Sequence, residues 1–315
     1  MSWKISHLVL AILALGISCK EKPEAVQKET VLEGKHLITY DNPMLSSEDP
    51  GIVIVDFRKA EEYETAHIPG SIQLYRNHFQ DASMPYPGMR LDREKTAASL
   101  GMAGISNQHT IIVYDDKGSP DASRFWWLLK LYNFEQVYLL DGGLGLWEKM
   151  GKKTSRDVPE IKPTVFLFPD KPDQPMVIEK EELLRHLSSE VPGIILLDAR
   201  SADEYSGKEM KSGALRAGRI PGSIHIDWAE SIDYSGTHTF KPTEELEKIY
   251  SKLGAGKEDT IVVYCHSGVR SSHTTFVLTE LLGYKHVLNY DGSWVEWSYD
   301  DLLPIETDSI TLLKK

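Results

Sequence analysis

One cysteine stands in a context that favours chemistry. Cys265 follows the apolar run Ile261–Tyr264, and a helical pattern, Ser271–Leu282, begins after a short loop. Open α/β sheets bind anions between the carboxyl end of a strand and the start of the next helix, where free N–H groups and the helix dipole create positive potential. Such surroundings lower the pKa of a thiol to roughly 3.5–7.5. The loop therefore predicts a thiolate nucleophile at Cys265.

The residues after this cysteine fit an anion-binding loop. Gly268 allows a tight turn, and Arg270 adds a permanent positive charge with a planar fork of donors. A buried cysteine with only a packing role is the alternative, since free cysteines often lie in cores. His266 and His273 have no carboxylate or second cysteine at metal-ligand spacing, so neither a metal nor another cofactor is expected.

A long internal repeat determines the expected domain organisation. The segment from Ile52 to Ile72 contains an apolar run, Asp-Phe-Arg, Glu-Tyr and Ile-Pro-Gly-Ser-Ile, and closely similar motifs recur in the same order from Ile194 to Ile224. The second copy carries an insertion around residues 207–217. A repeat of this length indicates two copies of one domain.

Short apolar runs alternate with helical patterns in both copies. The predicted strands are Ile52–Val55, Ile111–Tyr114, Val137–Leu140, Ile194–Leu197, Ile261–Tyr264 and Val287–Asn289. The predicted helices between them include Arg124–Leu131 and Thr243–Leu253. Continuous apolar strands alternating with helices predict an α/β fold, with a mainly parallel sheet in each copy and helices on both of its faces.

A proline-rich segment separates the copies. Five prolines lie between Arg156 and Pro175, and they exclude a regular helix there. The expected organisation is a signal or lipoprotein-like segment and tether at 1–35, a first domain at 36–155, a linker at 156–175, a second domain at 176–308 and a tail at 309–315.

The N-terminus has the features of an export signal. The apolar run Leu8–Ile17 is too short to span a bilayer of about 30 Å, and Cys19 follows it as in a lipoprotein cleavage site. We expect an exported protein that is periplasmic or lipid-anchored to a bacterial membrane through Cys19; a plain signal peptide or an uncleaved anchor helix is the alternative. Cys265 is then the single cysteine of the mature domains.

The loop and its flanks resemble a known family. Cys-x-x-Gly-x-Arg after Val-Val-Tyr is similar to the active loop of rhodaneses, and matching flanks occur at Arg219–Ser223, Phe240–Pro242 and Tyr290–Trp294. The resemblance extends from about His36 to Thr307 and is close to bacterial two-domain thiosulfate sulfurtransferases. It implies two tandem rhodanese-like domains.

The resemblance also implies residue roles. Cys265 matches the nucleophile that forms a persulfide, and the loop around the sulfur and the substrate comprises His266, Ser267, Gly268, Val269 and Arg270. Arg270 is expected to contact the substrate anion. Arg200 and Arg219 are expected to frame the pocket and bind substrate, with Asp198 as structural support for Arg200. Two-domain animal enzymes carry a lysine where this chain has Ser267, so the ligand of the sulfonate group stays open.

The first copy lacks the nucleophile. Asp115 occupies the position that matches Cys265, and a carboxylate cannot carry a sulfane sulfur. This domain is therefore expected to be catalytically silent and to supply one wall of an interdomain cleft.

The implied activity moves sulfur from thiosulfate to cyanide or a thiol acceptor through a persulfide, in a monomer. The alternatives are 3-mercaptopyruvate as donor and a non-turnover sulfur carrier. His266 and Pro87–Met89 depart from the mercaptopyruvate pattern, and Cys-x4-Arg is one residue shorter than the loop of related phosphatases and arsenate reductases. A net charge of −12 argues against a nucleic-acid partner.

Overall fold

The computed structural model describes residues 35–189 and 193–308. The predicted export signal, Cys19 and nearly all of the tether lie outside these residues, as does the predicted tail at 309–315. Within the part of the chain that is described, no helix is long and apolar enough to cross a membrane.

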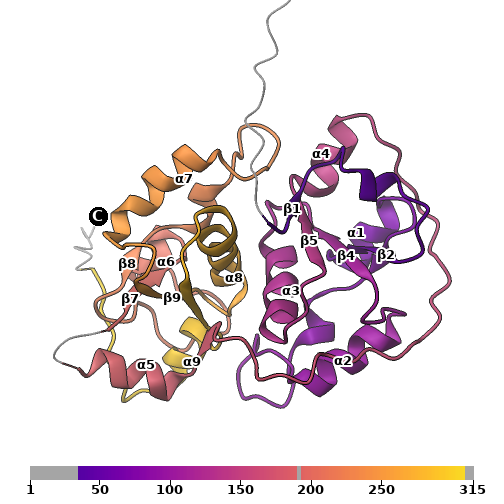
Figure 1. Cartoon of the computed structure of the whole chain (residues 1–315). Helices are drawn as coiled ribbons and strands as arrows, with labels where there is room; N and C mark the ends of the chain where they lie inside the picture. The colour runs from indigo at the N-terminus through magenta and orange to yellow at the C-terminus, as the bar shows by residue number, and fades with distance from the viewer. Residues whose placement is uncertain (1–34, 190–192, 309–315) are drawn as a thin grey trace, which may run out of the picture. The chain divides into compact units, whose positions relative to one another are not determined.

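Each copy forms a five-stranded sheet (Figure 1). The first sheet contains β1 (Leu37–Ile38), β2 (Ile52–Asp56), β3 (Ile72–Gln73), β4 (Thr110–Tyr114) and β5 (Val137–Leu140) in the order β1-β5-β4-β2-β3. The second contains β6 (Val177–Ile178), β7 (Ile195–Asp198), β8 (Ile224–His225), β9 (Thr260–Tyr264) and β10 (His286–Tyr290) in the order β6-β10-β9-β7-β8. All strand pairs are parallel, and the two orders are equivalent. The predicted duplicated α/β fold is confirmed.

Helices follow the strands in the same way in both copies. The first copy has α1 (Ala60–Thr65), α2 (Arg93–Met102), α3 (Pro120–Leu131) and α4 (Gly143–Lys149). The second has α5 (Lys180–Leu187), α6 (Ala202–Ser206), α7 (Thr243–Tyr250), α8 (Val269–Phe276) and α9 (Ser293–Tyr299). The helix predicted over 271–282 therefore begins at Val269, and its last part, Val277–Leu281, is a π-helical turn.

The two faces of each sheet belong to different apolar cores. Along β9, Ile261 and Val263 pack in one core while Val262 and Tyr264 pack in another, as the alternation of side chains in a strand requires. The second of these cores includes Trp294 of α9. The strands are apolar throughout because both of their faces are covered.

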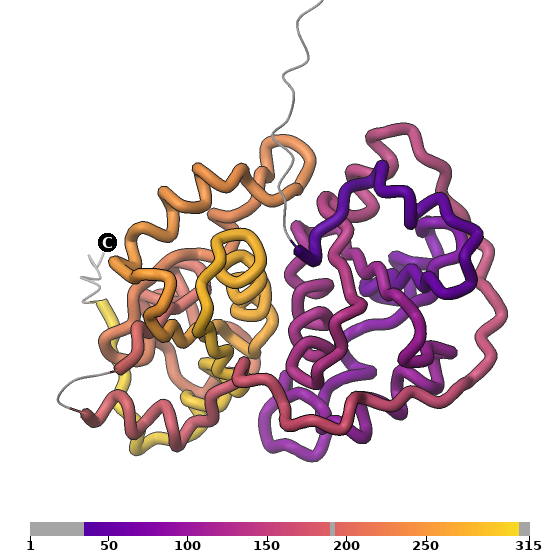
Figure 2. Tube along the Cα trace, viewed as in Figure 1, coloured from indigo at the N-terminus to yellow at the C-terminus, as the bar shows by residue number. Residues whose placement is uncertain are grey.

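The core that contains Val263 is continuous between the two copies. It includes residues of α3 and α8, whose Trp126 and Phe276 rings meet edge to face at 4.8 Å. Figures 1 and 2 show these two helices side by side. The loop from Cys265 to Gly268 precedes α8, so this contact fixes its position against the first copy.

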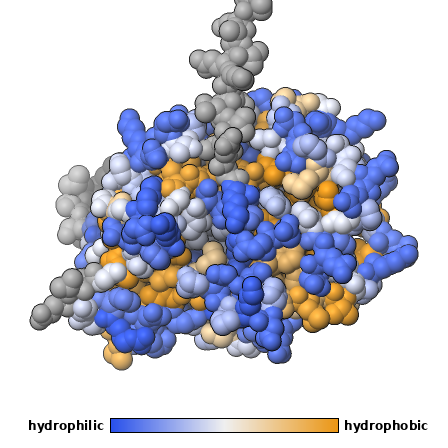
Figure 3. Space-filling model, in the orientation of Figure 1, coloured by the Kyte–Doolittle hydropathy of each residue, from blue (hydrophilic) through white to orange (hydrophobic). Residues whose placement is uncertain are grey.

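The proline-rich segment contains neither helix nor strand between residues 156 and 175. Figure 2 allows its path to be followed from the first copy to the second. Phe166 and Phe168 pack on Phe134 and Tyr132 of the first copy, with ring centroids 5.3 Å and 5.2 Å apart. The face of the molecule in Figure 3 is largely hydrophilic, with smaller hydrophobic areas between the polar ones.

Candidate active site

Cys265 lies directly after β9, at the carboxyl edge of the second sheet, and the loop from it leads into α8. Gly268 ends the turn with φ of 78°, in the left-handed region. A Cβ atom at this position would lie 2.7 Å from Arg124 Nη1 and 2.9 Å from Asp291 Oδ1. Both the turn and the close approach of these side chains therefore require glycine.

The sulfur of Cys265 lies in an environment that favours the thiolate. The residue is 1% exposed, and the Ser271 hydroxyl donates to Sγ at 3.5 Å. Burial alone raises the pKa of the thiol, but the charge of Arg270 and hydrogen bonds from the Ser271 side chain and from the Ser271 and Ser267 backbones outweigh it, so the pKa is lowered. A lowered pKa in a buried loop is typical of a reactive cysteine.

Two other backbone N–H groups of the loop fix its conformation. The backbone N–H groups of Cys265 and Gly268 both donate to Ser293 Oγ at 3.1 Å. The Ser293 hydroxyl in turn donates to the Tyr290 carbonyl at 2.8 Å. The Gly268 amide therefore holds the turn, and the expectation that the segment from His266 to Arg270 surrounds the sulfur stays a prediction.

Arg270 is engaged by a carboxylate. Its two terminal nitrogens donate to Glu204 at 2.5 Å and 2.8 Å, in a bidentate pair. Burial raises the pKa of Glu204, but Arg270 outweighs this and holds it at about 2. The resemblance implied that Arg270 contacts the substrate anion, whereas here its fork of donors is occupied by Glu204. The role of Glu204 was not predictable from the sequence, because Glu-Tyr is present in both copies.

Arg200 and Arg219 were expected to bind substrate, and neither lines the cavity beside Cys265. Arg200 is 1% exposed, pairs with Asp198 at 2.6 Å and donates to the Gly218 carbonyl at 2.8 Å. Arg219 contacts Asp308 at 2.7 Å. Both side chains reach neighbouring segments of the fold, and substrate binding by them stays a prediction. Asp198 and Arg200 form a buried pair at the turn after β7.

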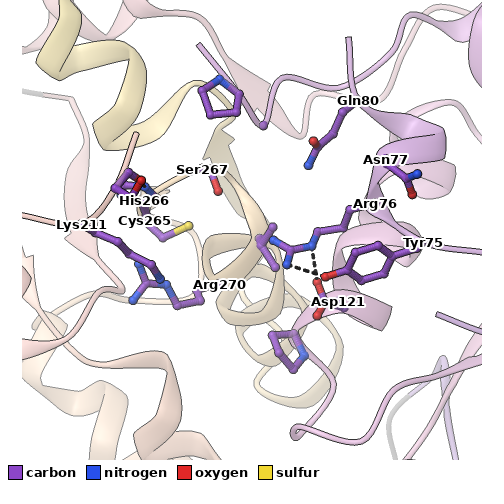
Figure 4. A pocket seen from close by; sticks show the side chains of 15 residues that line it. Tyr75, Arg76, Asn77, Gln80, Asp121, Lys211, Cys265, His266, Ser267 and Arg270 are labelled. Atoms are coloured by element: carbon purple, nitrogen blue, oxygen red, sulfur yellow. Dashed lines mark hydrogen bonds and ion pairs between the residues drawn. The ribbon is translucent and has the colours of Figure 1, made fainter. Parts of the chain in front are cut away.

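A cavity of about 540 Å³ adjoins Cys265 (Figure 4). From the second copy it is lined by Lys211, Ser212, Cys265, His266, Ser267, Val269 and Arg270. From the first copy it is lined by Tyr75, Arg76, Asn77, Gln80, Pro87, Gly88, Pro120 and Asp121. The first copy thus supplies one wall of the cleft, as expected from its silent loop.

Two cations of this cavity were missed by sequence reasoning. Arg76 forms an ion pair with Asp121 at 2.8 Å and donates to the Tyr75 hydroxyl at 2.8 Å. Lys211 comes from the insertion that only the second copy has, and its side chain is exposed. Both residues lie in segments without a recognisable motif, so no sequence signal pointed to them.

His266 connects the catalytic loop to that insertion. Its Nε2 lies 2.9 Å from the Ser212 carbonyl. Burial lowers the pKa of this histidine to about 4, so the ring is neutral near pH 7 and Nε2 carries the proton that it donates. Among the described residues no group of three or more His, Cys, Asp and Glu side chains could hold a metal ion.

Comparison with known proteins identifies the fold family. The sequence matches the family described as "Rhodanese-like domain" over residues 44–150 and 179–300. The chain belongs to the rhodanese family. The two matched regions correspond to the two sheets.

Similar proteins include both enzymes and a carrier by name. "Sulfur carrier protein TtuD" of Thermus thermophilus is 38% identical over 243 residues, which cover 75% of this chain and 83% of that protein. "Putative thiosulfate sulfurtransferase SseA" of Mycobacterium tuberculosis is 35% identical over 281 residues, which cover 86% of this chain and 90% of that protein. A solved structure of an anaerobic ergothioneine biosynthesis enzyme from Chlorobium limicola has a TM-score of 0.74 at 25% identity, covering 89% of this chain and 72% of that one.

The corresponding loop of the first rhodanese domain is filled by the Asp115 carboxylate. Asp115 is 2% exposed. It accepts backbone N–H groups from Lys117, Ser119, Asp121 and Ala122 at 2.9, 2.9, 2.9 and 3.1 Å. Burial raises the pKa of this carboxyl. The loop geometry for binding an anion is therefore retained, but the anion is a permanent part of the chain.

A buried carboxylate joins the two rhodanese domains beside the cavity. Asp291, after β10, forms an ion pair with Arg124 Nη2 at 2.6 Å and accepts hydrogen bonds from the Arg90 backbone and side chain at 3.0 Å and 3.1 Å. Arg124 also donates to the carbonyl of Gly88, a residue that lines the cavity, at 3.0 Å. This ion-pair cluster holds the first-copy wall against the catalytic loop.

Proposed function

We propose that this chain is a sulfurtransferase that moves a sulfane sulfur from thiosulfate to cyanide or a thiol acceptor through a persulfide on Cys265. The observation that carries the proposal is a buried thiol of lowered pKa that adjoins a cavity between two domains of the rhodanese family. The names of the Thermus and Mycobacterium relatives support sulfur transfer.

In the first half-reaction the Cys265 thiolate attacks the outer sulfur of thiosulfate. A sulfur–sulfur bond to Sγ forms, the sulfur–sulfur bond of thiosulfate breaks, and sulfite leaves with its electron pair. The Ser271 hydroxyl and the amides of Ser267 and Ser271 face the anionic sulfur before the reaction starts. Donors already in place stabilise charge without reorganisation.

In the second half-reaction the acceptor attacks the outer sulfur of the persulfide. Cyanide gains a carbon–sulfur bond and leaves as thiocyanate, while the bond to Cys265 breaks and its electrons restore the thiolate. A thiol acceptor gives its proton to solvent and leaves as a persulfide. The two steps form a ping-pong cycle.

Two other assignments fit the same loop. With 3-mercaptopyruvate as donor, the persulfide chemistry at Cys265 is unchanged and pyruvate leaves in place of sulfite. A carrier loads sulfur once and passes it on to a protein partner, and the name of the Thermus relative favours this candidate.

We also propose export and lipid attachment at Cys19, and a monomer. The apolar run Leu8–Ile17 before this cysteine supports the first part. Membrane fractionation of wild-type cells and of cells with Cys19→Ser is the test, and equal amounts of both proteins in the soluble fraction would exclude the anchor.

The deciding experiment measures thiocyanate formation from cyanide with thiosulfate or 3-mercaptopyruvate as donor, using protein without residues 1–19. Cys265→Ala is the control, and we expect turnover with thiosulfate that this substitution abolishes. Preference for 3-mercaptopyruvate would overturn the donor. Loading of sulfur on Cys265, seen by mass spectrometry, without turnover would replace the enzyme by a carrier.

A further inference from the structure

The charges that line the cavity are mostly neutralised in pairs. Arg270 is held by Glu204 in a bidentate pair, and Arg76 by Asp121 at 2.8 Å. A guanidinium that already binds a carboxylate has fewer free donors for a second anion. The two arginines therefore supply little net charge to an anionic donor that enters the cavity.

Lys211 is different. Of the cations that line the cavity, it has no ion-pair partner among residues 35–189 and 193–308. It lies on the same wall as Cys265, and Figure 4 shows it beside His266 and Arg270, across the cavity from Arg76. An ammonium group has three donors and turns freely toward an anion.

The segment that carries Lys211 is fixed on both sides. The neighbouring Ser212 carbonyl accepts from His266 of the catalytic loop at 2.9 Å. Further along, the Leu215 amide donates to Ser298 Oγ at 3.0 Å, and Arg216 donates to the Leu303 carbonyl at 2.9 Å. Because the insertion is anchored to the loop, to α9 and to the region after α9, the lysine lies at the cavity wall rather than at the tip of a free loop.

We propose that Lys211, rather than Arg270, binds the anionic group of the sulfur donor. This inference rests on the proposed function and identifies the residue that selects a small anionic donor for Cys265. The consequence is a division of labour: Arg270 with Glu204 sets the surroundings of the sulfur, and the inserted lysine recruits the donor. The silent copy, which lacks the insertion, also lacks this residue.

The test separates the two half-reactions. In a ping-pong cycle, kcat/KM for the donor reports only sulfur loading, and kcat/KM for the acceptor reports only sulfur release. Lys211→Ala is compared with Lys208→Ala, which removes an exposed lysine of the same insertion that pairs with Asp203 at 3.1 Å. Hydrogen cyanide is mostly uncharged near neutral pH, so its reaction serves as the internal reference.

We expect Lys211→Ala to lower kcat/KM for thiosulfate roughly ten- to a hundredfold and to weaken its dependence on salt. The value for cyanide should stay unchanged, and Lys208→Ala should match the wild type in both. A loss in both half-reactions would mean a general structural role and overturn the inference, as would unchanged thiosulfate kinetics.

A single-turnover measurement distinguishes this failure from failure of the proposed function. Sulfite release and persulfide at Cys265 are followed after mixing with thiosulfate. If the wild-type protein loads sulfur and Lys211→Ala loads it equally fast, the function stands and the role of Lys211 is wrong. If the wild-type protein does not load sulfur, the thiosulfate assignment and the inference both fail.

Discussion

Replacement of Glu204 by glutamine should separate stability from reactivity. The pKa of this carboxyl lies at about 2 in the folded protein, against 4.5 for an ordinary glutamate. That difference corresponds to about 3 kcal/mol of folding free energy at neutral pH. The residue is 4% exposed, so solvent screens the pair little. Removal of one partner of a buried ion pair typically costs about 3–5 kcal/mol, which agrees in size.

The pH dependence of this loss follows from the direction of the shift. The lowered pKa stabilises the fold fully above about pH 4.5, and the contribution disappears as the pH falls through about 2. Urea unfolding should therefore show Glu204→Gln less stable than the wild type by about 3 kcal/mol at pH 7. The difference in the free energy of unfolding between the two proteins should become smaller below pH 4.5. Glutamine keeps a side-chain oxygen that can accept from the Ser201 backbone N–H and hydroxyl, as Glu204 does at the helix cap.

The same substitution should destabilise the fold but favour the thiolate form of Cys265. Arg270 without its carboxylate exerts a stronger positive field on the sulfur, so the thiol pKa falls further and the acid limb of the donor kcat/KM moves to lower pH. Glu209→Gln, at an exposed position nearby, is the control and should change neither quantity. A stability difference below about 1 kcal/mol at pH 7, the size of a surface pair, would refute the reasoning.

Three further predictions concern the loops at Cys265 and Asp115 and the ion-pair cluster at Asp291. Ser271→Ala removes the hydroxyl that donates to Sγ, so the thiol pKa of Cys265 should rise and the acid limb of the pH–rate profile should move to higher pH; an unmoved limb would contradict this role. Asp115→Asn places an NH2 group against backbone N–H donors. Thermal or urea unfolding should therefore show a loss of about 1–3 kcal/mol in the free energy of unfolding, with activity per folded molecule retained. Wild-type stability would mean that the loop around Asp115 does not need the anion. Asp291→Asn leaves Arg124 without a buried counter-charge, and we expect a loss of about 3–5 kcal/mol in the free energy of unfolding together with a higher KM for the donor. An unchanged KM would show that the ion-pair cluster at Asp291 does not shape the cavity.

The fold could be predicted because it depends on local patterns that occur twice. Apolar runs such as Ile111–Tyr114 and Ile261–Tyr264 are readable as buried strands, and each proved to be a central strand. Helix ends were predicted less accurately than strands, since α8 begins two residues earlier than predicted, directly after Gly268. The left-handed glycine ends the turn and lets the helix begin at Val269.

The site was predictable only where it is local. Cys265 and its loop form a contiguous motif, so spacing alone pointed to them. Arg76 and Lys211 reach the cavity from segments distant in the chain, and the partner of Arg270 is a glutamate in α6. A sequence match gives no side-chain direction, so it could not show that Arg200 and Arg219 do not line the cavity.

The ion-pair cluster at Asp291 has a consequence for how the two halves of this duplicated chain evolve. A duplication commonly frees one copy from selection once it loses its chemistry. Here Arg90 and Arg124 of the silent copy neutralise a buried carboxylate of the active one. A substitution at either arginine therefore appears as a defect in the other half, so selection acts on the first copy through the stability of the second.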